Sequence, residues 1–555
     1  MSFIKNWKLL LWGLFSFLLI LLYINEWRML DKKLMTIFDE GYYYLTLQKA
    51  NNNEPNVGIS QWPYFISSLT NDNFLSDILN LRYLRYGFRI FTFIVFALLT
   101  GFTFLDKKNR KEFPVFFTIV SAMSFFSIGD MIITSNYLQE FNLLMIAVFC
   151  LLSYRVQKSY WLILSGFFSF ISLLIIPPSG LLVSLACIVL LILLYRKNTK
   201  MIFNSVLFYV VGFILSAAFV HVFIVDIQTI YQNIYIGTKY LMNANRGYGL
   251  IDHMIRLLFY FRDFFIQTSL ILGLYAFSYV VTRKIKPFLG WLLFAIGMLV
   301  FIYYAKKPAF NISTLWAFPI VLYVLQFLNT NDLSISSIKK MNIENVLINT
   351  FLFLLPLISV IGTNTPYASK MIVFILPWSL LLFNLYLTNN KSVNYKTIVM
   401  TVLAIPFLMV VKNFELKNDF SYKLPVDGPA SRMYLNHNQY QYFMKIDSLF
   451  NAYNFHKNQD YVFATTFDHM TIVTFQAKAL ETFQLPEDFL QYRKKEMLPS
   501  PKFIFMTEYD KQMLSDEFKK RDWGFPEKYD QYFIGTPDPE AIWKTERWLY
   551  CKKNN

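Results

Sequence analysis

The sequence contains few residues of the kinds that build disulfide frameworks and zinc centres. Only 3 of its 555 residues are cysteine and 5 are histidine. Cys150 and Cys187 lie inside apolar runs, and Cys551 is far from both. The histidines do not have the short spacings of zinc ligands. We therefore predict neither a disulfide-stapled fold nor a zinc centre.

Charged residues are also scarce, at 16% of the sequence, whereas hydrophobic residues make up 55% and aromatic residues 19%. A soluble chain of this length would divide into several domains with polar surfaces, and too few polar residues are present to cover them. The formal net charge of +16 does not predict a nucleic-acid partner, because the basic residues lie mostly in short loops between apolar runs. The composition predicts an all-α polytopic membrane protein.

About thirteen apolar runs are long enough to cross a bilayer core of roughly 30 Å. They lie at residues 9–24, 89–105, 113–128, 138–153, 160–176, 179–194, 202–225, 264–281, 287–304, 312–328, 346–361, 371–387 and 396–411. The first run is not followed by a small-residue cleavage site, so we expect it to be retained as a membrane helix.

Basic residues recur in every second connection between these runs. Examples are Lys107-Lys108, Arg196-Lys197, Arg283-Lys284 and Lys339-Lys340. Because cytoplasmic loops are enriched in lysine and arginine, this alternation places the N-terminus in the cytoplasm. We expect a multi-pass protein of the inner (cytoplasmic) membrane with residues 1–411 as its membrane domain. Residues 25–88 and 412–555 then lie outside the cytoplasm.

Two adjacent carboxylates mark the first outer loop, in the segment Phe38-Asp39-Glu40-Gly41-Tyr42-Tyr43-Tyr44. Adjacent acids repel each other, so the pKa of one of them is readily raised toward that of a proton acceptor. The alternative is structural. Asp39 would cap a helix running through Leu45 and Leu47, with Glu40 favourable in its first turn.

Two further elements follow in the same loop. Residues 61–65 have the aromatic-rich amphipathic pattern that suits the lipid headgroup region. Arg82, Arg85 and Arg89 then follow at helical spacing at the mouth of the second predicted span. Arginines at such a boundary commonly anchor lipid phosphates, and that is the structural alternative to a role in a site.

Candidate polar residues also occur in the later outer loops. Glu140 lies at the predicted membrane boundary before the fourth span, and Arg246 lies in the long loop that follows the seventh. Lys306 and Lys307 break the charge pattern, because they fall on the outer side, where the topology rule gives no reason for lysine.

The composition changes after residue 411, where lysine, glutamate, aspartate and glutamine become frequent. Unbroken or alternating apolar patterns predict strands, and acids followed by helical apolar spacing predict helices. Strands are predicted at residues 461–464, 502–506 and 543–550, and helices at 486–497 and 510–520. We expect a soluble α/β domain over residues 412–555, without a nucleophile elbow, a phosphate loop or metal-ligand spacing.

The order of these features resembles the GT-C superfamily of membrane glycosyltransferases. The nearest branch is that of the dolichyl-phosphate-mannose protein mannosyltransferases and the lipid A aminoarabinose transferases. There, an Asp-Glu-small-x-Tyr motif follows the first span, and a glycine, a Pro-aromatic segment and arginines lead into the second. An acidic motif opens the fourth span, and a proline-containing turn follows the fifth. The matching positions here are Asp39-Glu40-Gly41-Tyr42-Tyr43, Gly58, Pro63-Tyr64, Arg85, Arg89, Gln139-Glu140 and Pro177-Pro178.

The resemblance, which covers residues 1–190, implies transfer of a sugar from a polyprenyl-phosphate donor to a glycan, lipid or protein acceptor outside the cytoplasm. Asp39 would take the acceptor proton, and Glu40 would orient the acceptor or share that proton. Fixed positive charge would stabilise the leaving phosphate. The candidate residues for binding the donor phosphate and the substrates are Tyr43, Arg85, Arg89, Glu140, Arg246, Lys306 and Lys307.

Two positions depart from the family pattern. A lysine often precedes the Pro-aromatic segment, where this chain has Gln61-Trp62, and aspartate is common where it has Glu140. Contacts to the donor phosphate are therefore expected to have moved to other residues, such as Lys306-Lys307 or Arg246.

No cofactor is indicated, although carboxylates leave Mg²⁺ or Mn²⁺ open. A lipid or solute transporter and a non-catalytic assembly partner with the same fold are the alternative functions. A transporter predicts charges inside the spans and repeated halves, and the sequence has few of the former and none of the latter.

Overall fold

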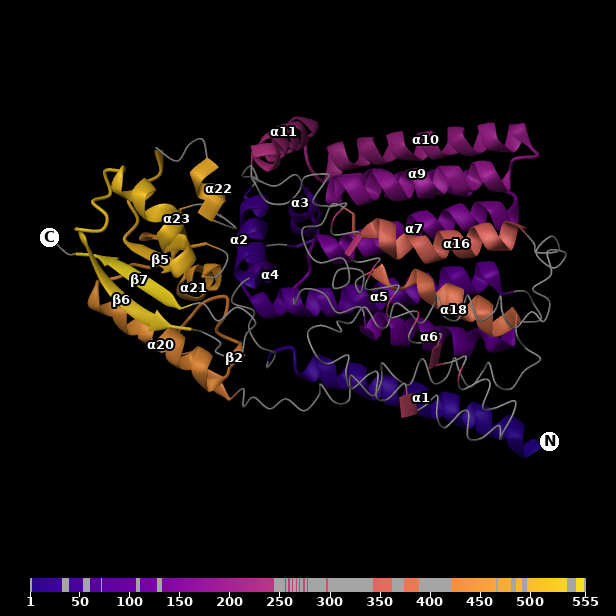
Figure 1. Cartoon of the computed structure of the whole chain (residues 1–555), viewed down its shortest axis with the longest axis horizontal. Helices are drawn as coiled ribbons and strands as arrows, with labels where there is room; N and C mark the ends of the chain where they lie inside the picture. Colours follow the sequence, from indigo (N-terminus) through magenta and orange to yellow (C-terminus); the bar gives the residue numbers. More distant parts are fainter. Residues whose placement is uncertain are drawn as a thin grey trace.

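The computed structural model describes residues 2–31, 39–52, 60–70, 72–105, 110–126, 132–243, 343–361, 374–388, 421–424, 426–465, 468–480, 486–491, 497–536 and 546–553, with isolated positions between 255 and 297. Long helices run side by side at one end of the molecule, and a sheet with its own helices forms the other end (Figure 1). The short helix α2 (Asp39–Asn51) lies between these two parts.

The helical block accounts for the predicted spans up to residue 225 and for two of the later ones. Its helices are α1 (Ser2–Arg28), α5 (Ile78–Phe104), α6 (Phe113–Phe126), α7 (Ser135–Val156), α8 (Leu162–Ile175), α9 (Pro177–Leu194), α10 (Thr199–Phe223), α16 (Ile343–Ser359) and α18 (Pro377–Thr388). Four of those described, α5, α7, α9 and α10, are long and apolar enough to cross a membrane. The predicted spans at 264–281, 287–304, 312–328 and 396–411 lie outside the described residues apart from isolated positions. The number of about thirteen therefore stays a prediction.

Small residues let the helices of the block approach closely. A Cβ atom at Gly166 of α8 would collide with the carbonyl oxygen of Tyr209, and one at Gly212 of α10 would collide with that of Ile163. Such contacts replace the hydrophobic driving force that is missing between helices in lipid. The opposite side of α10 exposes Ile214 and other large apolar residues, as expected for a helix that faces acyl chains.

We call one end of the block the motif end. It is formed by the start of α5, the start of α7 and the turn between α8 and α9, and it carries three further helices. These are α3 (Trp62–Ser67), α4 (Asp72–Leu75) and α11 (Ile227–Asn243). Short 3₁₀ turns, η1 (Arg110–Glu112) and η2 (Ser159–Trp161), precede α6 and α8.

Residues 61–65 do not present their aromatic side chains to lipid headgroups, as the sequence pattern suggested they would. Trp62, Pro63, Tyr64 and Phe65 are all buried in the protein interior. The aromatic pattern is the same whether protein or lipid covers the apolar side chains, so the sequence does not distinguish the two cases.

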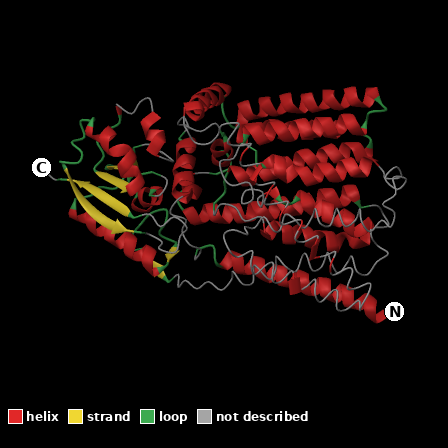
Figure 2. Ribbon diagram, viewed as in Figure 1, coloured by secondary structure: helices red, strands yellow, loops and turns green. Residues whose placement is uncertain are grey.

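The C-terminal part contains a five-stranded sheet with the order β4-β3-β5-β7-β6 (Figure 2). Its strands are β3 (Tyr461–Phe463), β4 (Lys478–Ala479), β5 (Phe503–Thr507), β6 (Tyr529–Gly535) and β7 (Arg547–Lys552). Strands β4, β3 and β5 are parallel, and β7 pairs antiparallel with both β5 and β6. A separate pair, β1 (Tyr422–Lys423) and β2 (Tyr434–Leu435), precedes it.

Both faces of the sheet are covered by helices. Phe503 and Phe505 of β5 belong to the same apolar core as α20 (His437–Ala452), whereas Ile504 and Met506 pack with α23 (Glu508–Lys519). The remaining helices are α21 (His469–Phe475) and α22 (Pro486–Gln491). Alternate residues of a strand point to opposite faces, so an unbroken apolar strand belongs in the middle layer of an α/β/α arrangement.

The predicted α/β pattern of the tail is confirmed. The strands predicted at 461–464, 502–506 and 543–550 correspond to β3, β5 and β7, and the two predicted helices correspond to α22 and α23. Helix α23 begins with a capping box between Thr507 and Asp510. The predicted domain boundary after residue 411 lies outside the described residues.

The sheet-containing part contacts the helical block directly at the start of α5. Ile78 N donates to the carbonyl oxygen of Pro429 at 3.0 Å. Asp77, the N-cap of α5, accepts from Leu79 N at 2.8 Å and from Arg432 Nη1 at 2.9 Å. The end of α5 that carries the three arginines is thus fixed from both parts of the molecule.

Candidate functional site

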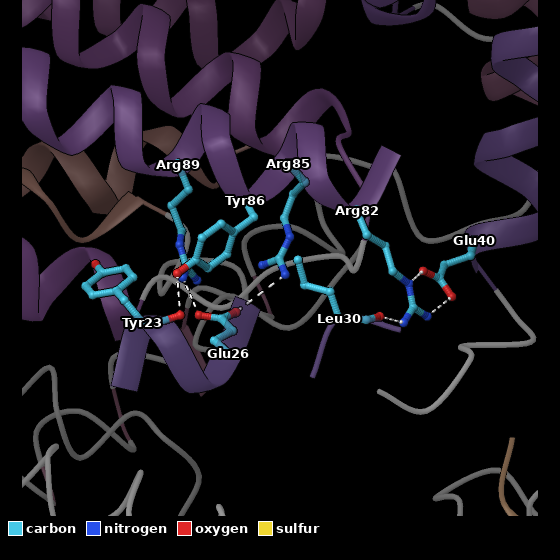
Figure 3. Close-up of polar contacts among 8 residues, drawn as sticks. All are labelled: Tyr23, Glu26, Leu30, Glu40, Arg82, Arg85, Tyr86 and Arg89. Carbon is cyan, nitrogen blue, oxygen red and sulfur yellow. Dashed lines mark hydrogen bonds and ion pairs between the residues drawn. The ribbon is translucent and has the colours of Figure 1, made fainter. Parts of the chain in front are cut away.

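Glu40 is buried against α5, where it forms a bidentate ion pair with Arg82 (Figure 3). Arg82 Nε donates to Glu40 Oε1 at 2.8 Å, and Arg82 Nη2 donates to Glu40 Oε2 at 2.7 Å. The third nitrogen, Nη1, donates to the carbonyl oxygen of Leu30 at 2.6 Å. Bidentate pairs of this kind are strong and fix orientation, so this one holds α2 in a defined position on α5.

Arg85 and Arg89 lie further along the same helix and share a second carboxylate, Glu26 of α1 (Figure 3). Arg89 Nη2 donates to Glu26 Oε2, and Arg85 Nη2 lies 3.5 Å from Glu26 Oε1. The guanidinium carbon of Arg85 lies 5.8 Å from the ring centroid of Tyr137 on α7. All three charged side chains are buried.

Gly41 is the point where α2 meets the C-terminal part. A Cβ atom at this position would lie 2.7 Å from the Cα atom of Met470 and closer still to the backbone between His469 and Met470. The ring of Tyr42 lies 5.7 Å from that of His469, measured between centroids. Only glycine lets the backbone of α21 come this close, so the small residue of the Asp-Glu-Gly motif has a packing role.

A buried polar cluster lies beside this contact. Arg547 Nε lies 3.2 Å from Asp468 Oδ1, and the Tyr442 hydroxyl donates to the same oxygen at 2.8 Å. Nearby, Asp510 Oδ2 accepts from Thr507 N at 2.8 Å. Burial raises the pKa of the Asp468 carboxyl, and it raises the pKa of Asp510 to about 6, because desolvation disfavours the charged form.

Two glutamines connect the other predicted motifs at the motif end. Gln61 Oε1 accepts from Asn233 Nδ2 of α11 at 3.0 Å. Gln139 Nε2 donates to Ser172 Oγ at 2.8 Å and to Ser179 Oγ at 2.7 Å. The acidic motif of α7 and the proline turn between α8 and α9 therefore lie side by side.

The other predicted site residues have the following places. Asp39 is the first residue of α2, and its side chain lies outside the described residues. Tyr43 contacts Trp62 edge to face, with ring centroids 5.8 Å apart. Glu140 is buried on α7, one turn after Tyr137. Arg246, Lys306 and Lys307 lie outside the described residues.

Sequence reasoning missed Glu26 and the Asp468–Arg547 pair. The available signal for Glu26 was its position, since an isolated carboxylate at the end of an apolar run requires a buried partner. For Asp468 and Arg547 no local signal exists, because each looks like an ordinary charge in a polar stretch. Among the residues that the structure describes, no three histidine, cysteine, aspartate or glutamate side chains lie close enough together to hold a metal ion.

No protein-family model matches the chain, and no curated protein matches it. Among solved structures, it is similar to the oligosaccharyltransferase of Archaeoglobus fulgidus in the apo form, at 12% identity and a TM-score of 0.46, over 96% of this chain and 73% of that one. The complex of that organism's oligosaccharyltransferase AglB with an inhibitory peptide and a dolichol-phosphate gives 10% identity and 0.44, over 96% and 73%. The complex with Zn and sulfate gives 11% and 0.39, over 90% and 68%. Likenesses this distant do not assign the chain to a family.

Proposed function

We propose that the chain is a membrane glycosyltransferase that transfers a sugar from a polyprenyl-phosphate donor to an acceptor hydroxyl on the extracytoplasmic face. The observation that carries the proposal is that motifs far apart in the sequence meet at the motif end. Helix α2 begins with Asp39-Glu40 and is fixed to the arginine-bearing start of α5, while Gln139 contacts the α8–α9 turn. This clustering supports a reaction centre at the membrane surface.

In the proposed reaction, the acceptor oxygen attacks the anomeric carbon from the face opposite the phosphate, and the configuration at that carbon inverts. Asp39 takes the proton of the acceptor hydroxyl as the new carbon–oxygen bond forms. The bond between the anomeric carbon and the phosphate oxygen breaks, and the polyprenyl phosphate leaves as an anion. No proton is needed on the leaving group, because its negative charge is stabilised by nearby cations.

Arg85 and Arg89 bring two buried guanidinium groups to the same carboxylate, Glu26, and this supports a role for one of them in holding that phosphate. Arg85 is the better candidate, because its contact with Glu26 is long, at 3.5 Å, and Arg89 already neutralises the same carboxylate. Arg246, Lys306 and Lys307 remain predicted contributors.

The role proposed for Glu40 is positioning. Both of its oxygens accept hydrogen bonds from Arg82, and this fixes the start of α2, where Asp39 lies. Tyr43, on the same helix and against Trp62, is proposed to form part of an aromatic surface for the sugar. Glu140 remains a predicted substrate-binding residue.

Replacement of Asp39 by asparagine tests the proposal. Asparagine keeps the size and the helix-capping ability of aspartate but does not accept a proton at neutral pH. We expect Asp39→Asn to lower the transfer rate by about 10²–10⁴-fold, with folding and donor binding retained. The matched control is Asp516→Asn, an exposed acid on α23, which should leave the rate unchanged.

The measurement is glycan mass spectrometry of the cell envelope and secreted proteins from cells lacking the chain and complemented with each form. The wild-type chain and Asp516→Asn should restore a glycan that Asp39→Asn does not restore. An identical glycan profile with and without the chain would exclude a glycosyltransferase. Full restoration by a normally folded Asp39→Asn chain would end the assignment of Asp39 as the base.

A further inference from the structure

A cavity of about 340 Å³ lies between the end of α10 and the start of α11, away from the Asp39-Glu40 motif. Its lining residues are Tyr64, His221, Val222, Phe223, Ile224, Val225, Asp226 and Thr229. The volume lies at the small end of the range found for ligand sites in proteins, which is about 300–1,000 Å³. It therefore has room for one small polar group such as a lipid headgroup.

Part of the lining is polar and in fixed positions. His221 Nδ1 lies 3.3 Å from Asp226 Oδ1, and Asp226 Oδ2 accepts from Gln228 N at 2.9 Å, which holds the carboxylate at the start of α11. Tyr64 is buried, and its hydroxyl accepts from Asn233 Nδ2 at 3.3 Å. These side chains present both donors and acceptors to the cavity.

The rim of the same cavity is apolar and exposed. Val222 and Phe223 are 68% and 67% exposed, and they continue the row of exposed apolar side chains along α10, which is long and apolar enough to cross a membrane. Helix α11, which lies beyond the end of α10 (Figure 1), also exposes a row of apolar residues. That row contains Ile227, Tyr231, Ile234 and Tyr235.

The spacing of these four residues puts them on one face of α11, and the rings of Tyr231 and Tyr235 stack with centroids 6.3 Å apart. Tyrosines on such a face are typical of the membrane–water interface, where the ring is in apolar surroundings and the hydroxyl is in water. The cavity thus opens at the level where the polar headgroup of a lipid meets its acyl chain.

We propose that this cavity binds the hydroxyl-rich headgroup of a membrane glycolipid, with the acyl chain lying along the exposed face of α10. Asp226, His221 and Thr229 hydrogen-bond the hydroxyl groups, and Val222 and Phe223 contact the first carbons of the chain. A sugar is favoured over a phosphate, because the described residues that line the cavity include a carboxylate and no lysine or arginine. An anionic headgroup would be repelled by Asp226.

A protection experiment on the full-length chain in phosphatidylcholine nanodiscs tests this inference without measuring any transfer. The three native cysteines are buried, so the thiol introduced by Val222→Cys reports on the rim. The probes are an alkyl glucoside, an alkyl phosphate and an alkyl phosphocholine of equal chain length. We expect the glucoside to slow maleimide labelling of that thiol by about tenfold and the other two to have little effect, as for a site of roughly 1–2 kcal/mol selectivity.

Asp226→Asn gives the second arm, because asparagine keeps the oxygen that caps α11 but loses the charge. It should reduce protection by the glucoside several-fold and relieve the exclusion of the phosphate. Gln232→Ala, on the exposed polar face of α11, is the matched control and should leave protection unchanged. Equal protection by all three amphiphiles, stronger protection by the phosphate, or no protection by any of them would overturn the proposal. Because the readout is binding, loss of the proposed transferase activity would not affect it.

Discussion

On its α5 side, helix α2 is held by a buried ion pair, whereas on the side of the C-terminal part it is held by backbone contact. Arg82 donates two hydrogen bonds, of 2.8 and 2.7 Å, to the carboxylate of Glu40. On the other side, the backbone of α21 approaches Gly41 so closely that no side chain fits between them. The first contact depends on opposite charges, and the second depends on the absence of a side chain at Gly41. Substitutions that remove a charge or add a side chain therefore test the two contacts separately.

The largest effect on stability is expected when the ion pair loses its carboxylate. Glu40→Gln leaves Arg82 charged and buried, which typically costs about 3–5 kcal/mol. Thermal unfolding of the purified chain measures the loss. The double variant Glu40→Gln/Arg82→Met should recover most of the stability, because both side chains of the pair are then neutral. A double variant as unstable as the single one would show that charge is not what matters here.

The next-largest effect is a dependence of folding stability on pH, which arises in the C-terminal part near the backbone contact. The folded-state pKa of Asp510 is raised to about 6, above its unfolded value, so the folded protein binds more protons than the unfolded one between about pH 4 and pH 6. Stability from this group is fully present below the unfolded pKa and is lost as pH rises through 6. The difference is at most about 3 kcal/mol, from 1.36 kcal/mol per unit.

Asp510→Asn should remove this pH dependence, because asparagine does not titrate. The fold should be retained, because the asparagine oxygen can still accept from Thr507 N. The measurement is the difference in unfolding temperature between the wild type and the variant at pH 5 and pH 7. We expect the variant to gain relative to the wild type at pH 7. A constant difference across that range would contradict the raised pKa.

A smaller effect is expected at the backbone contact. Gly41→Ala forces α2 away from α21 and should cost about 1–3 kcal/mol, the usual range for overpacking. Hydrogen exchange should rise in α2 and α21 together. Gly87→Ala on α5 is the matched control, because a Cβ atom there meets nothing within 4 Å and alanine favours the helix. If both alanine variants behave alike, the close approach at Gly41 does not constrain α2.

The smallest loss of stability is expected for Arg85→Gln, on the order of 1 kcal/mol, because Glu26 keeps its contact with Arg89. Arg89→Gln should cost more, since it removes the closer of the two arginine contacts to Glu26. If Arg85 holds the donor phosphate, its replacement should raise the KM for the donor in a chain that is otherwise well folded. An unchanged KM would make Arg85 a structural residue only.

The parts of the structure that the sequence predicted are those decided by local pattern. The apolar run at 502–506 predicted a buried strand, and an acid followed by helical apolar spacing predicted the helix at 510–520, which begins at Glu508 in the structure. The order of the Asp-Glu, arginine and proline motifs also predicts that they belong to one site, and this stays a prediction.

The long-range pairings were not predictable in the same way. The position of Glu26 indicates that it needs a partner but not that the partner is Arg89, and Gly41 resembles any small residue of a motif until α21 is placed against it. Both contacts form between segments that are far apart in the chain, and the sequence of one segment does not identify its partner.

Strand β7 lies inside the sheet, between β5 and β6, and this has a consequence for biosynthesis. Residues 547–552 must leave the ribosome before that sheet can form completely, although α2 is made within the first 51 residues. During most of translation the helix that begins with Asp39 therefore lacks its partner α21. We expect the close contact between α2 and α21 to form only after β7 has been synthesised and has paired with β5 and β6.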